Sequence, residues 1–191
     1  MLAKQELKAF LDEKSMLYEK TSFIDSDPIQ IPSQFKEKQD IEISGFLTSI
    51  IAWGNRKSII KNANKMMVLM GEAPFDFVIS HREKDLERLE GFVHRTFNAI
   101  DFKYFIKSLK NIYVSHGGLE QVFSQHVTNQ SVLEAISHFK KVFFDLDHPR
   151  RTRKHISDPC AGSAAKRINM FLRWMVRGNS SVDFGLWHCV T

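Results

Sequence analysis

The stretch Ile43-Ser-Gly-Phe-Leu-Thr-Ser-Ile-Ile-Ala-Trp-Gly-Asn-Arg56 decides the fold of this 191-residue chain. Its apolar residues recur at helical spacing over a wide arc, which predicts a largely buried central helix ending near Trp53. We expect that helix to begin at Ser33, which can serve as its N-cap. The Gly54-Asn55 pair breaks the helix, and a second helix is predicted over residues 56–70.

Further amphipathic segments lie on both sides of this helix pair. They predict helices over residues 3–20, after Pro74, after an Asp101 cap, over 119–127, after a Ser131–Glu134 capping box, and over 164–177. The sequence shows no convincing pair of strands and no internal repeat. We therefore expect one compact all-α domain over residues 1–191. It would consist of an N-terminal helix with a turn-rich lead-in (1–30), a helical core (33–145), and a basic loop, hairpin and final helix (146–191).

The composition narrows the class of protein. Hydrophobic residues make up 43% of the chain and aromatic residues 12%, which is typical of a folded protein. No stretch approaches the ~18 apolar residues that a membrane span needs, and residues 1–20 lack the apolar core of a signal peptide. Cys160 and Cys189 give no disulfide framework, so we expect a cytoplasmic protein that does not contact the membrane.

The positive charge of the chain is concentrated near its C-terminal end. Residues 148–177 contain eight lysines and arginines and only one acidic residue, Asp158, for a net charge of +7. Residues 1–147 carry a net charge of −1, so the whole excess lies in about 30 residues. Such a patch on a near-neutral body is typical of phosphate binding, although a solvated basic loop would show the same charge.

The segment Ser157-Asp-Pro-Cys-Ala-Gly-Ser-Ala-Ala-Lys-Arg167 combines a turn with a helix start. Gly162 permits a tight turn and Ser163 is a suitable N-cap, so the next backbone amides would form an anion site. Lys166 is predicted as the third helical residue, where the helix dipole disfavours a cation by roughly 0.3–1 kcal/mol. The same field favours the neutral amine that Schiff-base chemistry requires, but a solvated lysine would be the ordinary alternative.

The segment Gly162-Ser-Ala-Ala-Lys-Arg-Ile-Asn-Met-Phe-Leu-Arg-Trp-Met-Val176 resembles the hairpin of the helix-hairpin-helix DNA glycosylase superfamily. Residues 43–63 are similar to the early helix pair of that superfamily. The resemblance implies a glycosylase-like fold, with Lys166 as catalytic lysine and a carboxylate following its helix. Asp183 is the candidate for that carboxylate, with a cap or turn role as the alternative.

Nearly the full length of the chain more closely resembles an uncharacterised bacterial family with a domain of unknown function. The motifs that carry this resemblance are Ala52-Trp-Gly-Asn-Arg56, His94-Arg-Thr-Phe-Asn98, His116-Gly-Gly-Leu-Glu120, Arg151-Thr-Arg-Lys-His-Ile-Ser-Asp-Pro159, Ser163-Ala-Ala-Lys-Arg167 and Val182-Asp-Phe-Gly-Leu-Trp187. Members of that family continue into a Pro-Leu-Asp-Val-His segment. The resemblance therefore implies that the family's C-terminal segment, with its aspartate, is missing from this chain.

We therefore predict a DNA-binding protein of glycosylase-like fold that contacts backbone phosphates. If it is an enzyme, we expect base excision through Lys166 and Asp183. The alternatives are a non-catalytic nucleic-acid-binding module and a helical protein–protein adaptor. The residues predicted to contact DNA are Asn55, Arg56, Arg95, Arg150, Arg151, Arg153, Lys154, Gly162, Ser163 and Arg167. We expect no cofactor and no metal, since no metal-ligand motif is present.

Overall fold

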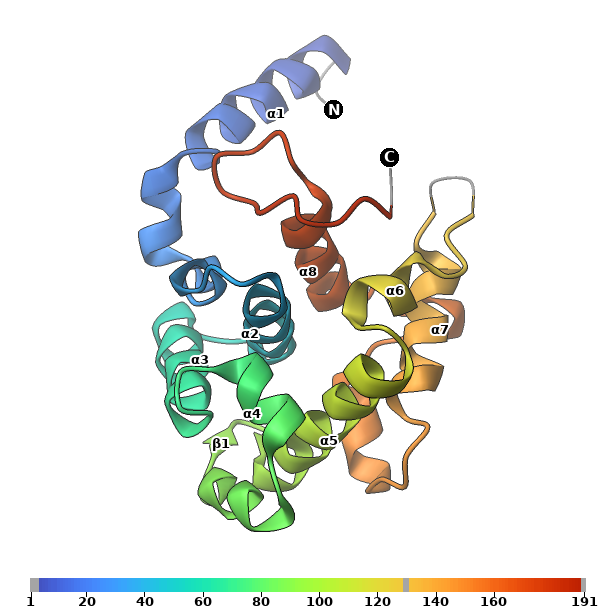
Figure 1. The fold of residues 1–191 in the computed structure, drawn as a ribbon. Coiled ribbons are helices and arrows are strands. Elements are labelled where there is room, and N and C mark those ends of the chain that lie inside the picture. Colours follow the sequence, from blue (N-terminus) through green and yellow to red (C-terminus); the bar gives the residue numbers. More distant parts are fainter. Residues whose placement is uncertain (1–3, 129–130, 190–191) are drawn as a thin grey trace.

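The computed structural model describes residues 4–128 and 131–189, and it is mostly helical (Figure 1). Helix α2 (Lys38–Ile51) lies at the centre, and eleven of its fourteen residues are buried. This confirms the central buried helix that its apolar spacing predicts. The helix starts five residues after Ser33, because Pro32 and Ser33 belong to a separate 3₁₀ turn, Pro32–Gln34. Ser33 does not cap α2, since its hydroxyl donates to the Ile29 carbonyl at 2.8 Å.

Helix α8 (Lys166–Val176) packs against α2 in the antiparallel sense. The start of α8 lies at the end of α2, where Arg167 donates to the Ile50 carbonyl. Met175 and Phe171 of α8 pack over Gly45 of α2, since a Cβ at this position would lie in van der Waals contact with both side chains, 3.4 Å from Met175 Cε. At one end of the α2–α8 pair α2 stops and α8 begins, and at the opposite end α2 begins and α8 stops. Different sequence motifs lie at the two ends.

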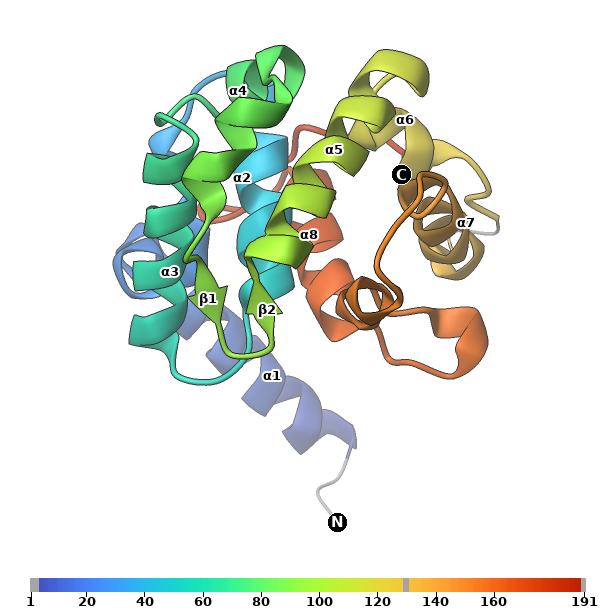
Figure 2. The same cartoon turned by 90° about the horizontal axis from the view of Figure 1, so that it is seen from below.

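Five further helices surround this pair (Figures 1 and 2). They are α3 (Arg56–Leu69), α4 (Pro74–Ser80), α5 (Ala99–Ser115), α6 (Leu119–Ser124) and α7 (Leu133–Phe143), whereas α1 (Lys4–Tyr18) extends away from the pair. Phe46 of α2 lies at the centre of the aromatic core. Its ring contacts those of Phe105, Phe139, Phe143 and Phe171 at centroid distances of 5.5–6.0 Å. Helices α2, α5, α7 and α8 thus share one core.

Three local predictions are wrong. Two strands, β1 (Val93–His94) and β2 (Phe97–Asn98), form a small antiparallel hairpin where no strand pair was expected. Asn98, rather than Asp101, is the N-cap of α5, and Asp101 completes its capping box by accepting from the Asn98 amide. Helix α7 begins after Val132 without a side-chain cap, so Ser131 and Glu134 do not form the expected box.

The start of α8 also differs from the prediction. Gly162 adopts the left-handed conformation expected of its turn, with φ of 83°. Ala165 is left-handed as well, so the helix begins at Lys166 and not near Ala164. Ser163 accepts from the Ala165 amide, at 3.2 Å, and does not cap the helix itself. Lys166 is therefore the first helical residue rather than the third.

Helix α1 projects from the rest of the molecule (Figure 1). It was expected as part of the lead-in to one compact domain, and none of its residues from Lys4 to Tyr18 is buried. Its connection to the body lies at its C-terminal end, where Arg177 donates to Glu19 and the Ser181 hydroxyl donates to the Glu19 carbonyl. Within the described part of the chain, no helix has the length and apolar character that crossing a membrane requires.

Candidate nucleic-acid interface

Arg167 lies at the end of the helix pair where α2 stops and α8 begins, and it connects the segments that meet there. Its guanidinium lies over the ring of Trp53, 4.6 Å from the ring centroid, and donates to the Ile50 carbonyl. It also contacts the His155 carbonyl at 3.5 Å. Burial lowers the pKa of Arg167, because the charged form loses water contacts there. Arg167 was predicted as a DNA contact, and the structure gives it a half-buried position that joins three segments of the chain.

Asp101 holds the basic loop against this end of the helix pair. Its carboxylate accepts from the Thr152 hydroxyl at 2.8 Å and lies 3.2 Å from the Arg151 guanidinium and 3.4 Å from His155 Nε2. Burial acts to raise the pKa of Asp101, but the contacts from His155, the Asn98 amide and Thr152 outweigh it and lower the pKa. This buried carboxylate therefore fixes the 3₁₀ segment Arg150–His155 to the start of α5.

The β1–β2 hairpin closes the same site from another side. His94 contacts the ring of Trp53 edge-on at 5.1 Å, and its Nδ1 lies 3.0 Å from Asn62 Nδ2 on α3. Burial lowers the pKa of His94. Figure 2 shows the hairpin beside α3. The Thr96 carbonyl at the hairpin turn accepts from Arg151 at 2.8 Å, so the hairpin and the basic loop are joined directly.

A shallow depression of about 330 Å³ lies where these segments meet. It is lined by Trp53, Thr96, Lys154, His155 and Arg167. These residues come from four of the six sequence motifs, those at 52–56, 94–98, 151–159 and 163–167. The structure thus brings together segments that lie more than 100 residues apart in the sequence.

Several exposed cations belong to the segments that form the depression or directly precede them in the sequence. Arg150, Lys154 and Lys166 are exposed, and among the described residues no carboxylate lies within 4 Å of their charged groups. Arg95 lies at the hairpin turn with φ of 54°, and its guanidinium occupies the space that a side chain at Gly54 would need. Arg153 is exposed as well, and packs over Phe144 at 5.3 Å.

The other predicted contacts have defined local roles. Asn55 is the N-cap of α3 and accepts from the Ser58 amide at 3.2 Å. Arg56 begins α3 and lies 4.0 Å from Asp27 Oδ2. Gly162 and Ser163 are exposed in the turn before α8. Arg151 is tied to buried Asp101.

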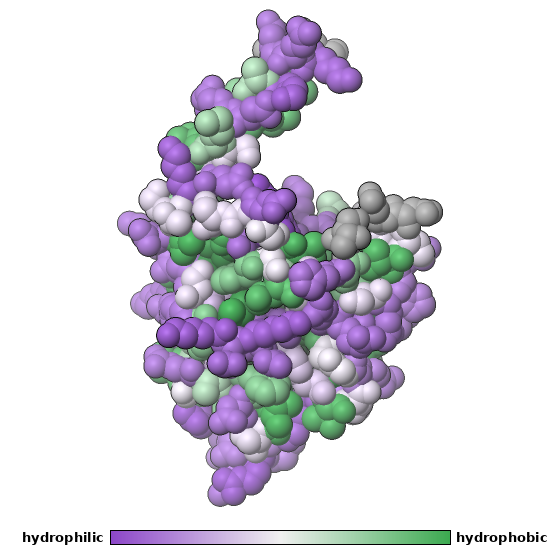
Figure 3. Space-filling model, turned by 45° about the horizontal axis from the view of Figure 1, so that its top comes forward, coloured by the Kyte–Doolittle hydropathy of each residue, from purple (hydrophilic) through white to green (hydrophobic). Residues whose placement is uncertain are grey.

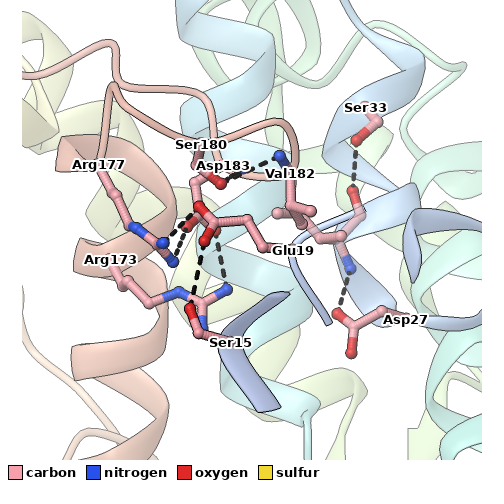
Figure 4. Close-up of polar contacts among 10 residues, drawn as sticks. Ser15, Glu19, Asp27, Ser33, Arg173, Arg177, Ser180, Val182 and Asp183 are labelled. Atoms are coloured by element: carbon pink, nitrogen blue, oxygen red, sulfur yellow. Dashed lines mark hydrogen bonds and ion pairs between the residues drawn. The ribbon is translucent and has the colours of Figure 1, made fainter. Parts of the chain in front are cut away.

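Asp183 does not share a site with Lys166. Its carboxylate is fully buried and lies 2.9 Å from Arg173 and 3.4 Å from Arg177, at the C-terminal end of α8 (Figure 4). Lys166 begins the same helix, and eleven helical residues span roughly 16 Å. The structure therefore places the two residues predicted to act together at opposite ends of α8, and gives Asp183 a structural role.

Sequence reasoning missed the parts played by His155, Thr96 and Asp101. His155 lay inside a basic run and Thr96 inside a motif, so only their motif membership could have indicated them. Asp101 was expected as a helix cap, whereas it binds Thr152 and Arg151 of the basic loop. No group of three or more His, Cys, Asp and Glu side chains placed to hold a metal ion is found among residues 4–128 and 131–189.

The two remaining motifs meet at the opposite end of the α2–α8 pair. Glu42, buried on α2, accepts from Trp187 Nε1 at 2.6 Å and from the Tyr113 hydroxyl at 2.5 Å. Burial raises the pKa of Glu42, with these two hydrogen bonds acting against the shift. Glu120 accepts from the His188 amide at 3.0 Å and from Lys38. This buried polar network therefore anchors the segment after α8 and is separate from the basic depression.

The comparisons with known proteins agree with the resemblance to a family with a domain of unknown function. No curated protein and no solved structure matches the chain. Residues 27–191 match the family described as "Protein of unknown function (DUF2400)". The matched residues include both ends of the α2–α8 pair and exclude α1. Because this match covers most of the sequence, the chain belongs to the DUF2400 family of proteins of unknown function.

Proposed function

We propose that this protein binds the phosphate backbone of DNA through the depression and the cations around it. The observation that carries the proposal is the convergence of four distant segments on one cationic site. Phosphate contacts supply most of the sequence-independent affinity of DNA-binding proteins. Arg150, Lys154 and Lys166 have the exposure and the free charge that such contacts need.

The polar network around Asp101 supports this role because it fixes the basic segment in place. Some cations of the segment make structural contacts, and others stay exposed. Arg151 and Arg167 hold the segment in place, and the neighbouring cations extend into solvent. A fixed array of charges loses less conformational entropy on binding than flexible side chains on a mobile loop. Arg151 and Arg167 thus position the site, and the exposed cations contact the ligand.

We further propose that the fold is related to the helix-hairpin-helix glycosylases. Three features support this relation: the buried helix α2 ending at a polar break, the left-handed Gly162, and Lys166 at the start of α8. One feature departs from the pattern. The first helix of the hairpin is represented by short 3₁₀ segments, Arg150–His155 and Pro159–Ala161.

Replacing Lys154 and Lys166 together by Ala is expected to weaken the binding of duplex DNA about tenfold or more near 0.1 M salt. Two lost phosphate contacts should also reduce the slope of log affinity against log salt by about 1.8. The melting temperature should stay nearly unchanged, because exposed charges contribute little to stability. Fluorescence anisotropy titrations of labelled duplex over a range of salt concentrations measure both quantities.

The matched control is Lys20→Ala with Lys36→Ala, which removes the same charge from exposed positions outside the four converging segments. This variant should bind DNA nearly as the unchanged protein does. Equal losses in the two variants would show that net charge alone attracts DNA. A flat salt response of the unchanged protein would favour a protein–protein adaptor.

Lys166 also supports a second candidate function, base excision through a Schiff base. Lys166 is exposed and directly precedes Arg167, which lines the depression, and no described carboxylate neutralises it. Its neutral amine would attack C1′ of the sugar as the bond from C1′ to the base breaks, and the base would leave with the bonding electrons and take a proton from water. Opening of the sugar ring, with loss of the protons of the attacking amine, would then give the Schiff base. Because Asp183 lies at the other end of α8, this chemistry would lack the carboxylate that the resemblance implies.

Borohydride trapping on a duplex with an abasic site tests this second candidate. If Lys166 is the reactive amine, borohydride should trap a covalent adduct with this duplex, because the aldehyde of an abasic site forms a Schiff base with an amine directly. Lys166→Ala should abolish this adduct and Lys154→Ala should retain it, and binding without any adduct would rule out the second candidate. An adduct that persists in Lys166→Ala would assign the trapped amine to another residue.

A further inference from the structure

Helix α1 carries an apolar stripe that stays about half exposed in the part of the chain that the structure describes. Leu7, Phe10, Leu11, Leu17 and Tyr18 follow the three- and four-residue spacing of one helix face. Their exposed fractions are 46–56%. Figure 3 shows hydrophobic side chains among hydrophilic ones along this projecting helix. The stripe lies before residue 27, so the core of the family domain does not account for it.

A helix of this length needs a packing partner. Isolated helices of about 12–15 residues are marginal in water, and most helical stability in proteins comes from burial of an apolar face. Helix α1 has fifteen residues, and none of them is buried against the body. Its contact with the body comes at its end, where Tyr18 meets Phe23 at 5.9 Å and Glu19 meets Arg177. The described residues of this chain do not bury the apolar face of α1, so this face is available to another molecule.

The charges of α1 indicate what kind of molecule this is. Residues 4–10 carry Lys4, Lys8 and Glu6, for a net charge of +1. Residues 11–18 carry Asp12, Glu13 and Lys14, for a net charge of −1. The helix as a whole is neutral, whereas helices that bind anionic membranes or nucleic acid have an excess of Lys and Arg. Two copies of α1 in antiparallel orientation place each positive half beside a negative half.

We propose that α1 pairs with α1 of a second copy of this chain in an antiparallel helical interface. Half of each of five large side chains gives on the order of 500 Å² per copy, or about 1,000 Å² in total, which is near the lower limit for a specific interface. The dimer therefore forms in a concentration-dependent way. Lys14 interrupts the stripe, but it lies over the Phe10 ring and contacts Glu13, so its charge is compensated within α1.

Sedimentation velocity over a range of protein concentrations tests this pairing. The unchanged protein should shift from monomer to dimer as its concentration rises. Leu11→Lys with Leu17→Lys should remain monomeric, with a melting temperature of the body like that of the unchanged protein. The control is Met16→Lys, since Met16 is 74% exposed on the opposite face of α1, and this variant should still dimerise.

A charge exchange tests the antiparallel orientation. Lys4→Glu with Lys8→Glu makes both halves of α1 negative and should weaken the dimer. Adding Asp12→Lys and Glu13→Lys gives halves of −3 and +3, which should restore the antiparallel pair and would repel in a parallel one. The added charges also suit the helix dipole, so the fourfold variant keeps its helix.

Three results would overturn the proposal. The first is an unchanged protein that stays monomeric at all concentrations. The second is a dimer that survives Leu11→Lys with Leu17→Lys, which would place the interface elsewhere on the body. The third is a monomer that floats with vesicles of anionic phospholipid and loses this binding in the same variant, which would assign the stripe to a membrane surface.

Discussion

Replacing Asp101 by Ala is expected to lower the free energy of unfolding by about 3 kcal/mol. The change leaves the buried Thr152 hydroxyl without its acceptor, which costs roughly 1–3 kcal/mol, and opens the capping box of α5, which costs about 1 kcal/mol. Arg151 contributes less, because it is partly exposed and can be hydrated instead. For a chain of this size the melting temperature should fall by about 10 °C.

The same change should also weaken DNA binding, because Asp101 fixes the segment that carries Lys154. Chemical denaturation and anisotropy titration measure the two effects. Asp76→Ala is the control, since Asp76 is an exposed residue in the first turn of α4. If Asp101→Ala loses stability and keeps its full affinity for DNA, the basic segment does not need this anchor.

The contribution of Asp101 should depend on pH in a defined direction. The pKa of Asp101 is lower in the folded protein than its ordinary value, so folding favours the ionised carboxylate. Its stabilising effect is therefore complete above the unfolded-state pKa of about 3.9 and is lost as the pH falls through the folded-state pKa. The difference in stability between the unchanged protein and Asp101→Asn should shrink below about pH 4.

Replacing Trp187 by Ala is expected to cost about 4 kcal/mol of stability. Trp187 is 1% exposed, and truncating a buried tryptophan typically costs 3–5 kcal/mol. The ring packs against Phe171 and Phe123, and its Nε1 donates to buried Glu42. Trp187→Phe should lose less stability than Trp187→Ala, because it keeps most of the apolar contact and loses mainly the hydrogen bond to Glu42.

This second change should leave DNA affinity nearly unaltered at temperatures where the variant is folded. Trp187 lies at the end of the α2–α8 pair opposite the depression, so the two ends are separable by mutation. His188→Ala is the control, because the His188 side chain is exposed. A loss of DNA affinity in folded Trp187→Phe would contradict this division.

The sequence predicts the main helices well because their signals are local. The apolar spacing of residues 43–51 indicates a buried helix without knowledge of its packing partners. That helix ends at Ile51, two residues before the predicted end near Trp53, and Asn55 caps the helix that follows. The N-terminal boundaries are less predictable, because competing contacts decide them. Ser33 could cap a helix, but its hydroxyl bonds back to Ile29 in a preceding turn.

The site follows from the sequence only in part. Charge density singled out residues 148–177, but it could not separate structural cations from exposed ones. Arg151 and Lys154 are three positions apart, yet one contacts a buried carboxylate and the other lines the depression. That difference depends on Asp101, which is 50 residues away, and on the small hairpin that brings Thr96 to the loop.

The position of Trp53 gives this protein a built-in optical reporter. Of its three tryptophans, Trp174 and Trp187 are almost completely buried, and Trp53 is partly exposed beside the Arg167 guanidinium. Iodide is an anion, so the surrounding cations attract it to Trp53 while the packed core excludes it from the other two indoles. Collisional quenching by iodide thus isolates the emission of one residue, and any ligand that covers the depression protects that fraction of the fluorescence without a label.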